Sequence, residues 1–546
     1  MAMVNGSQVL ARALRLQGVE TMFYLMGGPM MAAESACIEE GVRSIDVRHE
    51  QAAAMMAHAY ARVLNTVGVC MAASGPGTTN LVTGVANAFV DCAPLLAIGG
   101  CSPLSQNGRG AFQELDQLAI FKPFTKWAER VLDPKRIPEL VATALRQALS
   151  GRPGPVYLDM PGDVLYKQID EDEILYPEPN GNRPGGRAGG DPDLVRQALE
   201  LLGSARQPIV LTGSGILWSD ASAALQRWVE LAGLPFYTTP QGRGVVPDDH
   251  ELSFPGARST AFREADLIMV VGTRLNYVVG HLAPPRFRSD AKLIQIDIEP
   301  SEIGHNRPAD VGIVGDARAV LEQLVTAAHG RLDPRRYADW RERLGQVEES
   351  KRQEAEAAMA TDQRPIHPLR LCKEVRDFLD RDAILVVDGQ EILNYGRQSI
   401  PTFVPGHRLN SGPFGTMGVG LPFGLGAKAA KPDNQVLVLH GDGSFGLNAM
   451  ELDTAVRHKL PVVTVISLNG GWTADPQRNK PGRDLGYTAF HDMARALGCH
   501  GEYVEDPAEI RPALDRAYGS GGPALVNVLT DWRARATTTA FAVYST

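Results

Sequence analysis

The chain has 546 residues and a formal net charge of −9, with 44% hydrophobic and 21% charged residues. This length is too great for one hydrophobic core and predicts a globular protein of three or four domains. The acidic balance argues against a broad nucleic-acid-binding face, although a local basic pocket for a phosphorylated ligand remains compatible with it.

None of the six cysteines belongs to a CxxC pair, and several lie in apolar runs. We therefore expect buried free thiols in a reducing compartment. Residues 1–20 predict an amphipathic helix behind an Asn/Ser cap, without the continuous apolar stretch of a signal peptide. No run of about 18 uninterrupted apolar residues occurs, so no membrane span is expected. These features predict a cytoplasmic protein.

Apolar strand candidates alternate with helix candidates through residues 1–177, and the runs "VGVCMAAS" and "PLLAIGG" are examples. This alternation is typical of a parallel α/β sheet. Residues 178–193, "EPNGNRPGGRAGGDPD", are too rich in glycine and proline for a regular element. They predict a boundary after a first domain of residues 1–177.

Two further blocks repeat this rhythm. Residues 190–330 hold the strand candidates "PIVLTGSG", "LIMVVGTR" and "KLIQIDIEP", as expected of a doubly wound sheet that binds its ligand at the strand ends. Residues 331–366 contain a highly charged stretch that predicts a solvated linker helix. Residues 367–546 hold "AILVVDG", "QVLVLHG", "PVVTVISLN" and "PALVNVLT". The predicted fold class is α/β, with three doubly wound parallel-sheet domains.

Residues 440–472, "HGDGSFGLNAMELDTAVRHKLPVVTVISLNGGW", predict a strand, a tight turn, a helix starting near Ser444, a strand and a second tight turn. Parallel strands joined by a helix end at the same edge of a sheet, so Asp442 and Asn469 are expected to lie close together. The glycines allow close backbone approach to a ligand, and the helix start favours a phosphate. With a backbone carbonyl, these oxygens suit Mg²⁺. The residues therefore predict a Mg²⁺–diphosphate site.

The same stretch resembles the signature of thiamine-diphosphate (ThDP) enzymes, in which GDG is followed at a set spacing by an Asn pair. The resemblance implies two groups of ligands: Asp442, Asn469 and the carbonyl of Gly471 for the metal, and in addition Gly443 and Ser444 for the cofactor. The first Asn of the pair is Leu468 here, and the role of that position is left open. The three domains would be the pyrimidine-binding, central Rossmann-like and diphosphate-binding domains of this family.

ThDP enzymes also carry a glutamate in the first domain, and "DVRHEQAAAMMAHAYAR" supplies Glu50 at the start of an Ala/Met-rich helix. Without the resemblance, Glu50 would be interpreted as a first-turn acid favoured by the helix dipole. With it, Glu50 is the expected catalytic residue at the cofactor. Burial favours the neutral form of such a carboxyl group, which can then share a proton with the aminopyrimidine ring.

Two further segments match parts of these enzymes. In "GAFQELDQLAIFKPFTKW", residues 110–127, Phe112 and Gln113 match active-site positions of the acetolactate synthase-like branch, with a surface loop as the alternative for Gln113. "NSGPFGTMGVGLPFGLGAK", residues 410–428, matches the segment that grips the aminopyrimidine. There the carbonyl of Gly415 would meet the ring amine and Met417 would wedge between the two rings, although such a methionine is otherwise a core-packing residue.

The middle domain separates the branches of the family. Acetolactate synthases bind FAD there and carry an "RFDDRVTG"-like run, whereas this chain has "VVGTRLNYVVGHLAPPRF". That run resembles 2-hydroxyacyl-CoA lyases and oxalyl-CoA decarboxylases, so FAD is not expected. In the oxalyl-CoA enzymes this region binds ADP, for which Arg274, Asp297 and Asp316 are suitably placed. Asp297 would hold a ribose, or alternatively only cap its strand.

Residues 388–412, "DGQEILNYGRQSIPTFVPGHRLNSG", resemble the CoA-binding stretch of the lyases and decarboxylases. Asn394 and Arg397 would meet CoA phosphates, with plain surface solvation as the alternative. The Phe112–Gln113 pair follows the lyases, because the decarboxylases tend to carry Tyr-Glu there. Gly28 stands where both usually have a larger aliphatic residue, and the wider pocket would suit a branched acyl chain.

Together these features predict a ThDP- and Mg²⁺-dependent 2-hydroxyacyl-CoA lyase. It would cleave an acyl-CoA such as 2-hydroxyisobutyryl-CoA to formyl-CoA and an aldehyde or ketone, or run in reverse. The alternatives are oxalyl-CoA decarboxylase and an acetolactate synthase-like carboligase. The resemblance implies a homodimer or homotetramer with active sites between subunits. The segment after Ala536 is expected to close as a lid, or alternatively to fray, and neither nucleic acid nor a membrane is an expected partner.

Overall fold

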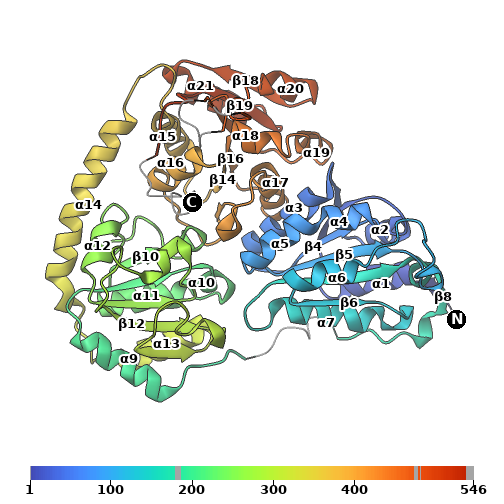
Figure 1. Cartoon of the computed structure of the whole chain (residues 1–546), viewed down its shortest axis with the longest axis horizontal. Coiled ribbons are helices and arrows are strands. Elements are labelled where there is room, and N and C mark those ends of the chain that lie inside the picture. Colours follow the sequence, from blue (N-terminus) through green and yellow to red (C-terminus); the bar gives the residue numbers. More distant parts are fainter. Residues whose placement is uncertain (1, 179–185, 473–477, 480, 537–546) are drawn as a thin grey trace. The chain divides into compact units, whose positions relative to one another are not determined.

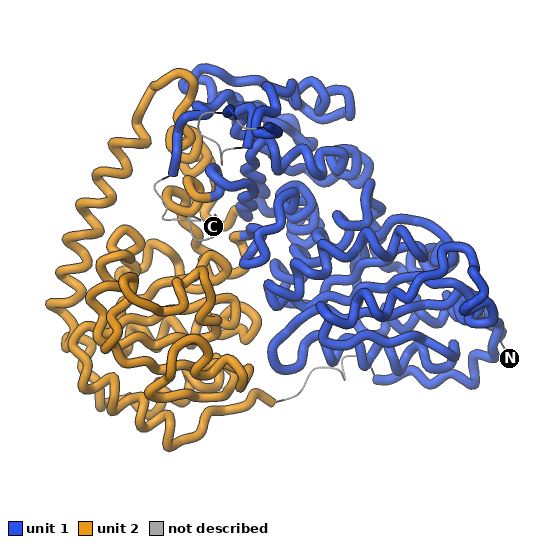
Figure 2. Tube along the Cα trace, in the orientation of Figure 1, with its two compact units in different colours: residues 1–184, 384–393, 409–546 blue, residues 185–383, 394–408 orange. Residues whose placement is uncertain are grey.

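The computed structural model describes residues 2–178, 186–472, 478–479 and 481–536 (Figure 1). The chain forms two compact units (Figure 2). Unit 1 comprises residues 1–184, 384–393 and 409–546, and unit 2 comprises residues 185–383 and 394–408. The first and third predicted blocks therefore share most of one unit, and the middle block with its linker forms most of the other.

The first sheet has six parallel strands in the spatial order β3-β2-β4-β5-β7-β6. Its strands are β2 (Thr21–Leu25), β3 (Arg43–Asp46), β4 (Gly68–Ala72), β5 (Leu95–Cys101), β6 (Trp127–Arg130) and β7 (Pro155–Pro161). The helices around it are α1 (Gly6–Leu16), α2 (Met31–Glu39), α3 (Glu50–Leu64), α4 (Pro76–Asn80), α5 (Val82–Val90), α6 (Gln117–Phe121), α7 (Ile137–Leu149) and α8 (Gly162–Tyr166). A short antiparallel pair, β1 (Met3–Asn5) with β8 (Gln168–Asp170), lies beside it.

Local sequence explains these elements. Strands β4 and β5 are buried along their whole length, as expected of parallel strands covered on both faces. The predicted cap of the first helix is confirmed: the side chain of Asn5 accepts from the backbone N–H of Gln8 at 3.0 Å, and the Gln8 side chain returns a bond to Asn5.

Unit 2 contains a five-stranded parallel sheet in the order β10-β9-β11-β12-β13. Its strands are β9 (Pro208–Thr212), β10 (Phe236–Thr238), β11 (Leu267–Val271), β12 (Lys292–Asp297) and β13 (Val311–Val314). Its helices include α9 (Pro192–Ser204), α10 (Ser214–Trp218), α11 (Ser222–Ala232), α12 (Arg258–Glu264), α13 (Ala317–Ala328), the charged α14 (Ala338–Met359) and α15 (Pro368–Phe378). This strand order reverses between β9 and β11, and ligands of open α/β sheets bind at such a reversal.

The third sheet has the order β15-β14-β16-β17-β19-β18. Its strands are β14 (Ile384–Asp388), β15 (Arg408–Leu409), β16 (Val436–Gly441), β17 (Val463–Leu468), β18 (His500–Val504) and β19 (Ala524–Leu529). The helices are α16 (Glu391–Ser399), α17 (Gly420–Ala430), α18 (Asp442–Gly446), α19 (Glu451–Arg457), α20 (Phe490–Ala496) and α21 (Ile510–Gly519). Numbered along the chain, its strands repeat the order 2-1-3-4-6-5 of the first sheet.

These sheets confirm the predicted α/β class with doubly wound parallel sheets. All six cysteines are buried and free, as predicted. Across the described ranges, the helices are too short or too polar to cross a membrane.

Candidate active site

Asp442 and Asn469 follow neighbouring parallel strands, β16 and β17, in which Gly441 is aligned with Ser467. The Asp442 carboxylate accepts the backbone N–H of Gly443 at 2.8 Å and that of Gly470 at 2.6 Å. Because Gly470 directly follows Asn469, the two turns are held together by this carboxylate. The structure thus brings together the two residues that the sequence predicted would meet.

The charge on Asp442 is poorly compensated by the chain itself. Burial raises its pKa to about 6, although the backbone N–H groups of Gly443 and Gly470 and the positive charge of Arg478 act in the opposite direction. A bound cation would stabilise the ionised form. Within the described residues no cluster of three or more His, Cys, Asp or Glu side chains could hold a metal. One carboxylate, the Asn469 amide oxygen and the Gly471 carbonyl form a hard-oxygen set, which fits Mg²⁺ completed by phosphate oxygens.

The glycine-rich turn after β16 differs in detail from the prediction. The helix expected near Ser444 begins at Asp442 as the five-residue α18, and a second helix, α19, begins at Glu451. The Ser444 hydroxyl is buried and donates to the carbonyl of Gly441 at 2.9 Å, so a contact with a diphosphate would come from its backbone. A Cβ at Gly443 would lie 2.7 Å from the Trp472 ring, so a side chain at this position would have to displace that ring.

Glu50 is the first residue of α3, at the carboxyl edge of the first sheet. Its side chain is buried, and one carboxyl oxygen accepts from the Asn80 amide at 2.9 Å. The other oxygen would be 3.2 Å from a Cβ at Gly77, so glycine leaves room beside it. The sequence did not reveal Asn80 as a partner of Glu50, because this contact depends on tertiary packing.

Gly28, Ser74 and Gln113 are joined at the ends of β2 and β4. The Ser74 hydroxyl is 3.0 Å from the Gly28 carbonyl and 2.5 Å from the side-chain oxygen of Gln113. One hydroxyl proton cannot serve both acceptors, so turning the Gln113 amide to donate to Ser74 satisfies all three groups. A Cβ at Gly28 would meet nothing within 4 Å, whereas Phe112 is 84% exposed. The predicted substrate residue Gly28 therefore borders open space beside Gln113.

The segment predicted to grip the aminopyrimidine follows the short 3₁₀ helix Gly412–Phe414. Gly415 ends that turn with φ +73°, a conformation that favours glycine, and Met417 is 38% exposed. The buried Asp388 carboxylate accepts the N–H groups of Gly418 and Gly420, each at 2.9 Å. Asp388 therefore anchors the chain directly after Met417, a supporting role that the sequence did not reveal.

In unit 2, Arg274 follows β11, and Asp297 is the last residue of the neighbouring strand β12. The buried Asp297 accepts the N–H of Glu299 at 2.9 Å. Asp316 caps α13 through the N–H groups of Arg318 and Ala319 and accepts the Ser219 hydroxyl at 2.8 Å. These contacts are those of strand-end and helix caps, and an ADP site at these three residues stays a prediction.

Unit 2 also contains an arginine cluster that sequence reasoning missed except for one member. We define it as Arg243, Arg258, Arg286, Arg397 and Arg408. Burial, together with the neighbouring Arg286, Arg243 and Arg397, lowers the pKa of Arg258 to about 10. Burial likewise lowers the pKa of Arg397 to about 10 and that of Arg408 to about 9.

The cluster is only partly neutralised within the chain. Arg243 donates to the Asp248 carboxylate at 2.9 Å, and Arg408 donates to the Gly396 carbonyl at 2.8 Å. Among the residues that the structure describes, the buried Nε atoms of Arg258 and Arg397 have no hydrogen-bond acceptor. Such groups favour an anionic ligand. The predicted Asn394 is buried on the same helix as Arg397, α16. The predicted lid beyond Ala536 lies outside the described residues.

Comparison with known proteins identifies the family. Three thiamine pyrophosphate (that is, thiamine diphosphate) enzyme models match: the N-terminal TPP binding domain at residues 4–120, the central domain at 195–324 and the C-terminal TPP binding domain at 394–528. A probable acetolactate synthase of Mycobacterium bovis is 37% identical over 544 residues, covering 97% of this chain and 96% of the relative. The 2-hydroxyacyl-CoA lyase of Oryza sativa subsp. japonica is 35% identical, with 97% and 96% covered.

The human 2-hydroxyacyl-CoA lyase 1 is 33% identical, with 97% of this chain and 95% of the relative covered. These relatives represent two of the three activities considered from the sequence, acetolactate synthase and 2-hydroxyacyl-CoA lyase. The matching domains cover the Glu50, Asp442 and Asn469 positions. The chain belongs to the thiamine pyrophosphate enzyme family.

Proposed function

We propose that the protein is a 2-hydroxyacyl-CoA lyase. It cleaves the C1–C2 bond of a 2-hydroxyacyl-CoA, so that C2 with its oxygen leaves as an aldehyde or ketone. The hydroxyl proton is lost as that carbonyl forms, and C1 gains a proton to give formyl-CoA. The reverse reaction condenses formyl-CoA with a carbonyl compound. Oxalyl-CoA decarboxylase and an acetolactate synthase-like carboligase are the competing activities.

The arginine cluster is the main structural support for this proposal. The buried Nε atoms of Arg258 and Arg397 have no acceptor among the described residues, and burying such charged donors is costly unless an anion pairs with them. The diphosphate and 3′-phosphate of CoA are anions of that kind, and guanidinium groups bind phosphates through paired N–H donors. Acetolactate and its pyruvate precursor carry no phosphate, so their conversion does not itself require the cluster.

FAD is the rival ligand, because it also contains a diphosphate and the 37% identical relative is a probable acetolactate synthase. Two sequence features support CoA instead. The run from Val270 to Phe287 follows the acyl-CoA enzymes and lacks the "RFDDRVTG"-like motif, and Phe112 with Gln113 follows the lyases. Two relatives with 33–35% identity are themselves 2-hydroxyacyl-CoA lyases.

In this proposal, separate residues activate the cofactor and bind its diphosphate. When bound, ThDP supplies the nucleophilic carbon and the electron sink for carbon–carbon cleavage. Glu50, held by Asn80, exchanges a proton with the aminopyrimidine ring. Asp442 and Asn469, with the Gly471 carbonyl, hold Mg²⁺ and through it the diphosphate.

On the substrate side, the amide of Gln113, anchored by Ser74, orients the substrate hydroxyl. The open space at Gly28 accepts the second substituent of a branched C2. Mg²⁺ as the metal, a homodimer or homotetramer, and a cytoplasmic location complete the proposal. The buried free thiols support the last of these.

A product assay tests the proposal. The purified protein with ThDP and Mg²⁺ is given 2-hydroxyisobutyryl-CoA, a straight-chain 2-hydroxyacyl-CoA, oxalyl-CoA or pyruvate, and formyl-CoA, carbonyl product and acetolactate are quantified. We expect formyl-CoA with an equimolar ketone or aldehyde, and no turnover by Glu50→Ala. Acetolactate from pyruvate together with bound flavin absorbance would contradict the proposal, as would formyl-CoA from oxalyl-CoA alone.

A pocket variant sharpens this assay. Gly28→Ile should reduce kcat/KM for the branched substrate by about 10- to 100-fold and leave the straight-chain substrate within about threefold, because a side chain would occupy the open space. Equal losses on both substrates would remove Gly28 as a determinant of branching.

A further inference from the structure

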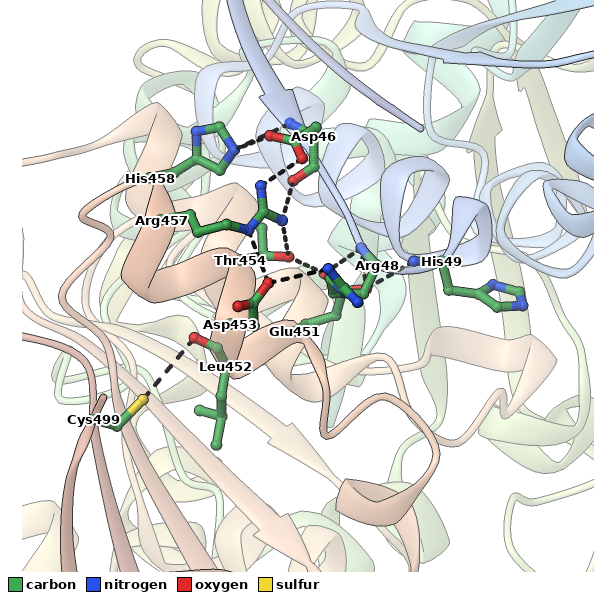
Figure 3. A network of polar contacts seen from close by, with 10 residues as sticks. All are labelled: Asp46, Arg48, His49, Glu451, Leu452, Asp453, Thr454, Arg457, His458 and Cys499. Carbon is green, nitrogen blue, oxygen red and sulfur yellow. Dashed lines mark hydrogen bonds and ion pairs between the residues drawn. The ribbon is translucent and has the colours of Figure 1, made fainter. Parts of the chain in front are cut away.

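A buried glutamate of the third sheet's domain contacts the segment that carries Glu50 (Figure 3). Glu451, the first residue of α19, is 1% exposed. One of its carboxylate oxygens accepts the backbone N–H groups of Arg48 and His49, both at 3.1 Å. The other accepts the Thr454 hydroxyl at 2.6 Å. The carboxylate thus replaces water at two backbone donors far away in the sequence.

These two donors belong to the residues immediately before Glu50. Arg48 and His49 connect β3 to α3, and His49 is the N-cap of α3, accepting the N–H of Gln51 at 3.2 Å. The direction of the backbone at this junction sets where the Glu50 side chain points. We propose that Glu451 is a positioning residue for Glu50. This inference rests on the role proposed for Glu50 and not on which acyl-CoA is the substrate.

A second set of contacts fixes the same junction from α19. Arg457 bonds to the Asp46 side chain and donates to the Asp46 carbonyl at 3.1 Å, and the His458 ring is 2.6 Å from the Asp46 carboxylate (Figure 3). Arg457 also donates to Asp453 at 2.8 Å. The junction between β3 and α3 is therefore held at both ends by one helix, with Glu451 nearest to Glu50.

The hold depends on the charge of Glu451. Burial raises its pKa to about 7, opposed by the Thr454 hydroxyl, the N–H groups of Arg48 and His49, and Arg457. An ionised carboxylate makes charge-assisted hydrogen bonds with the N–H groups of Arg48 and His49, whereas a protonated carboxyl group accepts them more weakly. As the pH falls through about 7, the hold on Arg48 and His49 weakens. Titratable and charged groups face this site from both sides. They are Asp453 and Arg457 on α19 with His458 directly after it, and Asp46 at the end of β3 with Arg48 and His49 after it.

The first test needs no substrate. In Glu451→Gln the carboxylate becomes a neutral amide, whose oxygen can still accept the N–H groups of Arg48 and His49 but without charge assistance. Amide hydrogens of the peptide spanning residues 47–52 should therefore exchange at least about threefold faster. Asp453→Asn on the same helix is the matched control, because Asp453 contacts Arg48 and Arg457 only through side chains. Unchanged exchange in Glu451→Gln, or equal acceleration in the control, would overturn the proposal.

The second test uses the pH profile of whichever ThDP-dependent turnover the wild type shows, acetolactate formation included. Glu451→Gln should lower kcat about 10- to 100-fold at pH 8 and leave KM within about twofold. The fall in kcat that the wild type shows below about pH 7, the acidic limb of its pH profile, should be absent in the variant. Should this variant fail to fold, Thr454→Val serves instead. It removes a donor that favours the ionised form, so the acidic limb should move to higher pH. A limb that stays in place would count against Glu451.

Discussion

At the scale of single residues, the ionised Asp442 carboxylate lowers the stability of the folded chain when no cation is bound. Its carboxylate is buried and its pKa is raised to about 6 from an ordinary value of 3.8. Between these two values the folded chain binds a proton more readily than the unfolded chain does. Its contribution to stability is therefore present at low pH and lost as the pH rises through about 6.

This gives a prediction for Asp442→Asn in metal-free, cofactor-free protein. The free energy of unfolding of the variant, relative to wild type, should rise between pH 4 and pH 7, by about 2 kcal/mol. Adding Mg²⁺ and ThDP at pH 8 should stabilise only the wild type. Calorimetry measures both effects. A pH-independent difference between the two proteins would show that Asp442 is not the titrating group.

The sequence pattern could reveal residues that a ligand requires but not the residues that hold them. Asp442 and Glu50 stand in recognisable turns after strands, and the structure places both at sheet edges. Ser74, Asn80 and Glu451 act through side-chain contacts to residues distant along the chain. Periodicity and propensity carry no information about such partners. The arginine cluster was missed for the same reason, since its members come from residues 243–408.

At the scale of elements, the packing of α3 against α17 joins the first and third sheets' domains within unit 1. Helix α3 is rich in alanine and buried along most of its length. At Gly426 of α17, a Cβ would lie 2.3 Å from the carbonyl oxygen of Met56, so only glycine allows this approach. The position of α3, the helix that begins with Glu50, therefore depends on a glycine in another domain, Gly426.

Gly426→Ala should consequently lower the free energy of unfolding by about 2–4 kcal/mol, because the added methyl group displaces a backbone carbonyl. Gly345→Ala is the matched control: it also lies inside a helix, α14, and its Cβ would meet only Phe254, at 3.8 Å. That change should be neutral or stabilising by up to about 1 kcal/mol. Denaturant unfolding of both variants measures the contrast, and equal effects would exclude the close approach as the cause.

The elements themselves were largely predictable, whereas their association was not. Apolar runs ending in glycine or aspartate, such as β9, β12 and β16, indicated parallel strands because burial on both faces removes the polar alternation. The stretch between Asp442 and Asn469 was expected to hold one helix, but two short helices occupy it. The turn between α18 and α19 does not change the hydrophobic pattern, so the periodicity of the sequence does not reveal that the helix is interrupted there.

At the scale of the whole molecule, the first and third sheets share one strand order, and each bears half of the predicted site at its carboxyl edge. Large apolar side chains are exposed near both edges: Met26 is 66% and Phe112 84% exposed on the first domain, and Phe414 is 48% and Met417 38% exposed on the third. Exposed apolar groups of this size favour a partner surface. A second copy of the chain is the partner that the family resemblance implies.

If each active site takes Glu50 from one chain and Asp442 from the other, two inactive variants should restore one another. A dimer of one Glu50→Ala chain and one Asp442→Ala chain contains one intact site and one doubly altered site. Random mixing makes half of the dimers mixed, so activity should recover to about a quarter of the wild-type value per chain. The measurement is turnover of the unseparated mixture after co-expression of the two variants. Sites built within one chain would give no recovery, since every site would then carry one of the two substitutions.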